Sequence, residues 1–275
     1  MNSQKIESKD NPRLKLVRKV RDGLEPTFIF VEGVRLAEEA VRSNLSIEFC
    51  VFEKGTDAES RQTDLLDSVW SKTTNIFEVD GSLFSAISDT RSPQGIILIC
   101  KRPRADRGSF EDEREKRSAV LPLTILLSEV NNPSNLGAVI RAAEAAGVAG
   151  IVVSKNSADI FSPKALRGSM GSTFRMPIWA GATNAEAIDW ARSSGVSTVG
   201  ATADADRSYT EIDWAKPRML ILGSEAHGIP VDVEPQLDER ISIPMDANVE
   251  SLNLAVAAGI MLFEARRQVR NNDRI

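Results

Sequence analysis

Three short segments in the second half of the chain carry polar residues whose types and spacing could support chemistry. Asn135 lies in the turn NNPSN after an apolar run, and Arg141 lies six residues later in an Ala-rich stretch. Glu225 stands in MLILGSEAHGIP, and Ser251 and Asn253 follow the polar turn after ISIP. An arginine in apolar surroundings usually pairs with an anion or a carboxylate. A glutamate at the carboxyl end of a strand lies where open α/β sheets bind ligands.

The last of these segments, ISIPMDANVESLNLAVAAG, predicts a strand, a turn and a helix. Ile241 and Ile243 indicate a strand that Pro244 should end, because proline removes a backbone donor and fixes φ. Ser251 occupies the position expected for a helix N-cap. The apolar stripe of that helix consists of Leu252, Val256, Ile260 and Phe263. Free backbone groups in the turn could hold the edge of a planar polar ligand, and an ordinary strand–turn–helix connection is the simpler alternative.

The other two segments repeat this strand–turn–helix pattern. Leu123–Leu127 indicates a strand, and the Ala-rich run 136–146 predicts a helix. Arg141 in that helix could bind an anion or form a structural pair with Glu144 at spacing i, i+3. The glycines that flank Glu225 permit positive φ and a close approach of the backbone.

Together the three segments resemble the SpoU (TrmH-like) family of RNA ribose 2′-O-methyltransferases, within the knotted SPOUT superfamily. The resemblance covers the last 155 residues and rests on three motifs in the family's order. They are Asn132-Pro133-x-Asn135-x-Gly137-Ala138-x-x-Arg141, Gly223-x-Glu225-x-x-Gly228, and Ile243-Pro244-Met245 followed by Ser251-Leu252-Asn253. Two positions depart from the family's pattern, because Ala247 replaces a usual glycine and Ala142 replaces a usual Thr or Ser.

The resemblance implies an enzyme that transfers a methyl group from S-adenosylmethionine to a ribose 2′-hydroxyl of structured RNA, with 23S-type rRNA as the expected substrate. A tRNA substrate, or a non-catalytic RNA-binding paralogue, is the alternative. The implied catalytic residues are Arg141, Asn135, Glu225, Ser251 and Asn253. The implied cofactor-binding residues are Gly223, Ser224, Ile243, Met245 and Leu252. Arg141 would act as a base or, since a free guanidinium is always protonated, as an electrostatic stabiliser of a developing oxyanion.

The same resemblance implies a C-terminal SPOUT domain with a deep trefoil knot. It also implies a homodimer, in which Arg141 of one chain faces Ser251 and Asn253 of its partner. The alternation of apolar runs with helical patterns predicts an α/β domain with a parallel sheet independently of the resemblance. The expected strands are 123–127, 150–153, 197–201, 219–222 and 241–243, and the expected helices are 136–146, 163–170, 184–193 and 251–267.

The first hundred residues predict a small α/β domain. Its expected strands are 27–31, 47–51, 76–79 and 96–100, and its expected helices are 34–43 and 65–70. Glu32-Gly33 and the run SPQG before the last strand resemble the substrate-binding domain that precedes many SpoU enzymes, which has a fold like that of a ribosomal RNA-binding protein.

Basic residues dominate the first 21 positions, where seven Lys or Arg residues face one Glu and one Asp. Such a cluster is typical of a phosphate-binding surface on an otherwise acidic protein, although a solvated charged helix gives the same pattern. We expect Arg13, Arg18 and Lys19 to contact RNA.

The composition sets the remaining expectations. The chain has 275 residues and a net charge of −5, which fits two domains: 1–100 binds RNA and 121–275 carries the methyltransferase site. Between them, 101–120 is so rich in charge that we expect a solvated linker. No apolar run approaches a membrane span, which predicts a soluble, cytoplasmic protein. Cys50 and Cys100 are expected to be buried thiols, and with His227 as the single histidine we expect no metal site.

Overall fold

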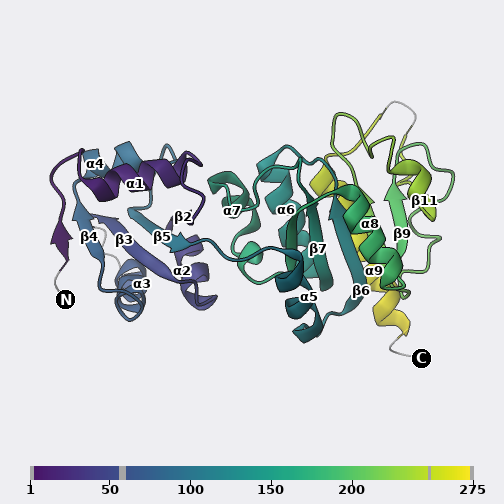
Figure 1. Cartoon of the computed structure of the whole chain (residues 1–275), viewed down its shortest axis with the longest axis horizontal. Coiled ribbons are helices and arrows are strands. Elements are labelled where there is room, and N and C mark those ends of the chain that lie inside the picture. The colour runs from purple at the N-terminus through teal and green to yellow at the C-terminus, as the bar shows by residue number, and fades with distance from the viewer. Residues whose placement is uncertain (1–2, 56–59, 247–248, 273–275) are drawn as a thin grey trace. The chain divides into compact units, whose positions relative to one another are not determined.

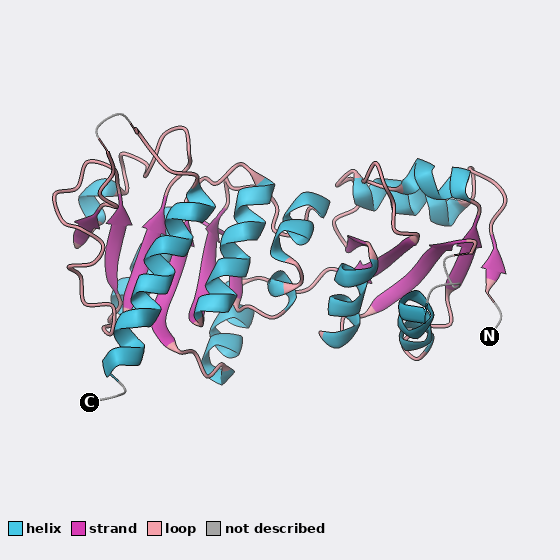
Figure 2. Ribbon diagram, turned by 180° about the vertical axis from the view of Figure 1, so that it is seen from behind, coloured by secondary structure: helices cyan, strands magenta, loops and turns pink. Residues whose placement is uncertain are grey.

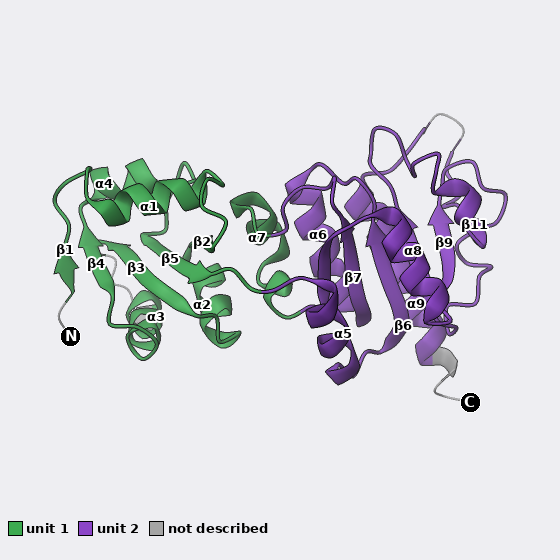
Figure 3. Ribbon diagram, viewed as in Figure 1, with its two compact units in different colours: residues 1–103, 161–175 green, residues 104–160, 176–275 purple. Residues whose placement is uncertain are grey.

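The computed structural model of the chain describes residues 3–55, 60–246 and 249–272. Ala247, the departure from the third motif, therefore lies outside the described residues. Figure 1 labels the elements along the chain, and Figure 3 colours the two compact units into which the chain divides. The first unit consists of Met1–Pro103 and Phe161–Arg175, and the second of Arg104–Ile160 and Met176–Ile275.

The first unit is built on a mixed sheet with the strand order β1-β4-β3-β5-β2. Its strands are β1 (Gln4–Lys5), β2 (Phe28–Glu32), β3 (Ile47–Glu53), β4 (Ile76–Val79) and β5 (Ile96–Lys101). Its helices are α1 (Pro12–Arg21), α2 (Val34–Arg42), α3 (Ser60–Trp70) and α4 (Gly81–Ile87). Helices lie on both faces of the sheet, as Figure 2 shows. Helix α1 buries Leu14, Val17 and Val20, which share one face at helical spacing, against the aromatic residues of the sheet.

A segment from the second half of the sequence packs with the first unit. It contains α7 (Pro163–Ser169) and a short 3₁₀ helix, η2 (Ser172–Phe174). Arg167 of α7 forms an ion pair with Asp89, with Nη2 2.7 Å from Oδ2, and Arg175 forms another with Glu39. The compact units therefore group residues 161–175 with the first unit, whereas the sequence prediction assigned 121–275 to one domain.

The second unit contains a six-stranded sheet in the order β11-β9-β10-β6-β7-β8, with every pairing parallel. Its strands are β6 (Leu121–Leu127), β7 (Val148–Ser154), β8 (Ile178–Ala182), β9 (Ser197–Ala201), β10 (Arg218–Leu222) and β11 (Glu239–Ile241). Its helices are α5 (Arg107–Lys116), α6 (Pro133–Ala146), α8 (Asn184–Ser193), η3 (Glu234–Gln236) and α9 (Leu254–Asn272). The parallel α/β class is confirmed, whereas the trefoil knot stays a prediction from the resemblance.

The charged stretch 101–120 is not a solvated linker throughout, and that prediction is wrong for α5. The helix begins at the N-cap Asp106, whose carboxylate accepts a hydrogen bond from the backbone N–H of Ser109 at 3.0 Å. Phe110 is fully buried and packs edge-on against Trp190, with 5.2 Å between the ring centroids. One aromatic side chain thus anchors a helix whose other residues are mostly charged. Figure 2 shows that helices lie on both faces of the six-stranded sheet of the second unit.

The third motif folds differently from the sequence prediction at two points. Strand β11 ends at Ile241, before Ile243 and Pro244. Helix α9 begins at Leu254, and its N-cap is Asn253, whose Oδ1 accepts hydrogen bonds from the N–H groups of residues 255 and 256 at 3.0 and 3.3 Å. The expectation of an N-cap at Ser251 is therefore wrong, and Asn serves as an N-cap as well as Ser does.

Candidate active site

The first motif leads from the carboxyl end of β6 into α6. Asn132 is the N-cap of α6, and its Oδ1 accepts hydrogen bonds from the N–H groups of Ser134 and Asn135 at 2.9 and 3.3 Å. Pro133 occupies the first helical position, where its fixed φ and missing N–H carry no penalty. Asn135 therefore lies in the first turn of the helix, and its side-chain amide is free to bond outside the helix.

Side chains from all three motifs meet in one hydrogen-bonded cluster. The Nδ2 group of Asn135 donates to Oε1 of Glu225 at 2.5 Å, and Nδ2 of Asn253 donates to the same oxygen at 3.2 Å. Asn253 also donates to Oδ1 of Asn135 at 3.2 Å, and the N–H of Leu254 lies 3.4 Å from the Glu225 carboxylate. The carboxylate thus lies at the N-terminus of α9, where the helix dipole favours negative charge.

Arg141 lies two turns further along α6 and is exposed. Among the described residues it makes no hydrogen bond or ion pair, so the structure lacks the expected alternative, an Arg141–Glu144 pair. Within the described part of the chain its guanidinium therefore has no anionic partner.

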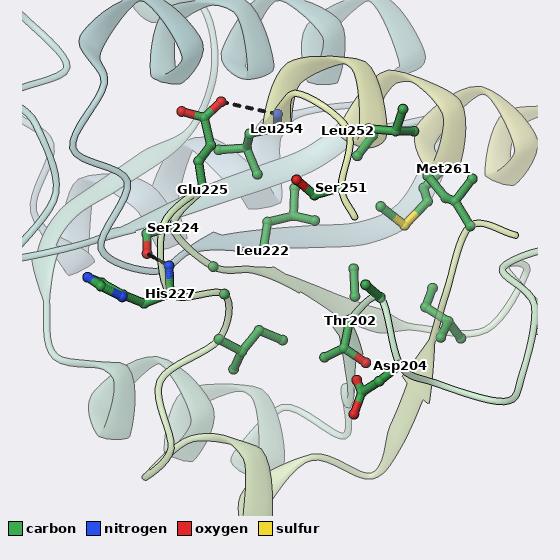
Figure 4. A pocket seen from close by; sticks show the side chains of 18 of the residues that line it. Thr202, Asp204, Leu222, Ser224, Glu225, His227, Ser251, Leu252, Leu254 and Met261 are labelled. Atoms are coloured by element: carbon green, nitrogen blue, oxygen red, sulfur yellow. Dashed lines mark hydrogen bonds between the residues drawn. The ribbon is translucent and has the colours of Figure 1, made fainter. Parts of the chain in front are cut away.

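A cavity of about 360 Å³ opens over the carboxyl ends of β9, β10 and β11, beside the start of α9. Its lining residues are Ala201, Thr202, Ala203, Asp204, Leu222, Gly223, Ser224, Glu225, His227, Gly228, Ile229, Glu234, Ile241, Ile243, Met245, Ser251, Leu252, Leu254, Ala257 and Met261. Figure 4 shows Thr202 and Asp204 on the opposite side of the cavity from Glu225. The carboxyl edge of a parallel sheet is the usual place for a ligand in such folds.

The structure brings together most of the residues that the sequence predicted for the site. All five predicted cofactor-binding residues line the cavity, and so do Glu225 and Ser251. Asn135 and Asn253 join it through their hydrogen bonds to Glu225, whereas Arg141 is not among the lining residues. Their roles stay predictions.

Sequence reasoning missed one wall of the cavity, which follows β9. Thr202 and Asp204 reach the cavity because β9 lies between β10 and β11 in the sheet. Strand order cannot be read from one sequence. The available signal was that both residues directly follow the carboxyl end of a predicted parallel strand.

Gly223 sits where no side chain fits. A Cβ at this position would lie 2.0 Å from the carbonyl oxygen of Gly228 and 2.4 Å from the backbone nitrogen of Ile229. Two backbone hydrogen bonds of 3.0 and 2.9 Å join Ser224 and Gly228 and close the loop that carries Glu225. Gly228 serves a different purpose, because its φ of 65° is the left-handed conformation that glycine adopts without strain.

The charges around the cavity are mainly negative. Asp204, Glu225 and Glu234 line it, and within the described part of the chain its lining contains no Lys or Arg. Arg240 approaches from outside the lining, with Nη2 2.5 Å from Oδ1 of Asp204. The hydrogen bond from this guanidinium lowers the pKa of Asp204, so the carboxylate is ionised at neutral pH.

The predicted RNA-binding residues all lie on α1 of the first unit, but their environments differ. The Arg13 guanidinium lies over the rings of Phe77 and Phe49, at 4.5 and 5.4 Å from their centroids. Arg18 donates to the backbone carbonyl of Lys9 at 2.8 Å, and Lys19 is exposed. Both arginines therefore also have structural contacts within the unit.

Comparisons with known proteins match both halves of the chain. Residues 122–263 match the SpoU rRNA Methylase family, and residues 11–98 match the MRM3-like substrate binding domain. The 23S rRNA (guanosine(2553)-2′-O)-methyltransferase RlmP of Bacillus subtilis is 29% identical over 266 residues, which cover 96% of this chain and 99% of that protein.

Two solved structures are similar over nearly the whole chain. The SpoU methyltransferase AviRb from Streptomyces viridochromogenes has a TM-score of 0.81 at 25% identity, covering 95% of this chain and 99% of its own. The AdoMet-bound rRNA methyltransferase from Sinorhizobium meliloti has a TM-score of 0.80 at 29% identity, covering 96% and 98%. With the motif residues assembled at one edge of the parallel sheet and the family model matching more than half of its length, the chain belongs to the SpoU rRNA methylase family.

Proposed function

We propose that the chain transfers a methyl group from S-adenosylmethionine to a ribose 2′-hydroxyl of ribosomal RNA. The observation that carries this proposal is the direct connection between the cavity and the Asn135–Glu225–Asn253 cluster. Family membership supports the methylase activity, and the name of the similar Bacillus subtilis protein supports rRNA rather than tRNA as the substrate.

The cavity fits S-adenosylmethionine as its ligand. Its volume lies within the roughly 300–1,000 Å³ that small-molecule sites occupy. Leu222, Ile229, Ile241, Ile243 and Leu252 give it apolar walls that suit an adenine ring. The backbone turns around Gly223 and Met245 would provide amides and carbonyls for the ring edge. When bound, the cofactor supplies an electrophilic methyl group on its sulfonium.

The chain's own residues would orient and stabilise the reacting hydroxyl. Asn135 and Asn253 hold Oε1 of Glu225 in place, so the carboxylate is positioned before any substrate arrives. A ribose hydroxyl is a poor nucleophile, and oxygen gains negative charge as its proton leaves. Arg141 carries a permanent positive charge, and it would stabilise that oxyanion.

A second copy of the chain would complete the site. Arg141 is exposed on α6, which packs against α9 within the unit, and α9 leaves Val256 and Phe263 each 51% exposed. These two large apolar side chains lie seven residues apart, about two helical turns, and they suit burial against a partner. In the homodimer, Arg141 of one chain would approach Ser251 and Asn253 of the other.

Mixing two inactive variants tests this arrangement. Arg141→Ala removes the cation from one chain, and Gly223→Ala disables the cavity of the other. Heterodimers of the two variants contain one complete site if the site is shared, so part of the activity should return. No activity in verified heterodimers would show that each site is built within one chain.

The first unit would hold the RNA, and the basic side chains of α1 would form part of the binding surface. We place the protein in the cytoplasm, where rRNA is available.

Incubation of the protein with labelled S-adenosylmethionine and either rRNA or tRNA tests the proposed reaction. The label should enter rRNA as an alkali-resistant ribose 2′-O-methyl group. Label in tRNA alone would correct the substrate, and no transfer to either RNA despite cofactor binding would support a non-catalytic paralogue.

A further inference from the structure

The cavity carries an imbalance of charge that the methyl transfer itself does not explain. Of its three carboxylates, Glu225 contacts neutral amides and a backbone N–H, and Asp204 is paired with Arg240. Glu234 is exposed and has no ion pair among the described residues. Arg240 offsets one of these three charges and also attracts Glu234, and the described lining contains no Lys or Arg, so an excess of negative charge remains around the cavity.

The two forms of the cofactor differ in charge. S-adenosylmethionine carries a sulfonium and an ammonium against one carboxylate, which leaves one net positive charge. Its demethylated product, S-adenosylhomocysteine, has lost the sulfonium charge and is neutral overall. A negative potential attracts the ammonium of both molecules, but it attracts S-adenosylmethionine more strongly because only that form carries the sulfonium charge.

We propose that Asp204 and Glu234 make the cavity distinguish S-adenosylmethionine from its demethylated product by charge, and that they thereby favour release of the product. This inference rests on the proposed function. Asp204 lies on the side of the cavity opposite Glu225, so its charge acts independently of the catalytic cluster (Figure 4). Each methyl transfer removes the charge to which these carboxylates are attracted, and the product then dissociates more readily than the substrate.

Isothermal titration of the full chain with each ligand tests the proposal, with the ratio of the two dissociation constants as the readout. Asp204→Asn and Glu234→Gln remove one charge each with little change in shape. Asp232→Asn is the matched control, because Asp232 is an exposed carboxylate outside the lining. Arg240→Gln removes the cation beside Asp204 and makes the opposite change in charge.

Both carboxylates are exposed to solvent, so each neutralisation should reduce the preference for S-adenosylmethionine by about twofold, and the double variant by about fourfold. Arg240→Gln should increase the preference for S-adenosylmethionine, and the Asp232→Asn control should leave it unchanged. In the wild type, 0.5 M salt should reduce the preference, because it shortens the Debye length to roughly 4–5 Å and screens these charges. Sinefungin has a carbon that bears a protonated amine in place of the sulfonium. Its dissociation constant should therefore change across the variants in the same way as that of S-adenosylmethionine.

Three results would overturn the proposal. The first is an unchanged ratio in the double variant. The second is the same change in the Asp232 control. The third is sinefungin following S-adenosylhomocysteine, which would trace the preference to contacts with the methyl group. Failure of the wild type to bind S-adenosylmethionine at all would instead contradict the proposed function.

Discussion

Replacing Gly223 by alanine should disable the cavity through a single methyl group. The added Cβ would lie 2.0 Å from the carbonyl oxygen of Gly228 and 2.1 Å from its carbonyl carbon. Ordinary contacts between such heavy atoms begin at roughly 3.3 Å, so the backbone must move by about 1 Å or more. The atoms that must move are backbone, so no side-chain rotation can absorb the clash.

Displacing this loop should lower both the free energy of unfolding and the activity of the site. Its closure by two backbone hydrogen bonds is worth roughly 0.5–1.5 kcal/mol each, so the variant should lose about 1–3 kcal/mol of unfolding free energy. The same loop carries Glu225, which is bonded to Asn135 and Asn253. A shift of about 1 Å in a positioned group can reduce the rate about a hundredfold. The affinity for S-adenosylmethionine should fall with it, because Gly223 and Ser224 line the cavity.

Calorimetry with S-adenosylmethionine and urea unfolding followed by tryptophan fluorescence measure the two effects. Gly228→Ala is the matched control, because its Cβ would meet nothing within 4 Å and only the φ of 65° is strained. That strain should cost about 1 kcal/mol and reduce binding less than the Gly223 clash does. If Gly223→Ala binds the cofactor within twofold of the wild type and unfolds at the same urea concentration, the close approach at residue 223 does not shape the site.

Three further predictions concern other parts of the chain. Arg141→Ala should reduce kcat by at least about a hundredfold and leave cofactor affinity within about twofold. Equal losses of kcat and of cofactor affinity would refute a role confined to the transition state. Lys9→Gln with Lys19→Gln should flatten the log–log salt dependence of RNA binding by about one unit per lost phosphate contact, whereas a slope equal to that of the wild type would exclude both lysines. Burial raises the pKa of the Cys100 thiol from 9.0 to about 12, so its contribution to stability is complete below pH 9 and is lost as pH rises toward 12. Burial raises the pKa of the Cys50 thiol as well, so both thiols contribute to the loss. Urea unfolding at pH 10 should therefore show a loss that is about 1 kcal/mol smaller in Cys100→Ala than in the wild type, and an identical loss in both would place the ionisation elsewhere.

The motif segments could be recognised from sequence because each joins an apolar strand to a helix through residues with strong turn preferences. Pro133 fixes φ in the first turn of α6, and Gly223 permits the close approach of the Gly228 carbonyl five residues later, so neither consequence depends on distant parts of the chain. Asn135, Glu225 and Asn253 follow those turns at the carboxyl edge of one sheet, and their meeting is a consequence of parallel strand pairing.

The remaining features depend on contacts between distant segments. Helix α5 is anchored by the buried ring of Phe110. The neighbouring residues are mostly charged, so the average polarity of the segment predicts an exposed linker and conceals this one apolar anchor. Asp204 reaches the cavity only because β9 lies next to β10, which is a matter of strand order. The segment Phe161–Arg175 packs with the first unit through ion pairs such as Arg167–Asp89, and such pairs join surface residues that have no sequence signature.

Mapping ribose 2′-O-methylation across the rRNA and tRNA of cells with and without the gene tests directly whether the chain methylates rRNA. One rRNA ribose should lose its methyl group when the gene is deleted. Wild-type protein should restore that methyl group, and Arg141→Ala protein, produced at the same level, should not. Complete rRNA methylation in the deleted strain, with a methyl group missing from tRNA or from no RNA, would show that rRNA is not the substrate of this chain.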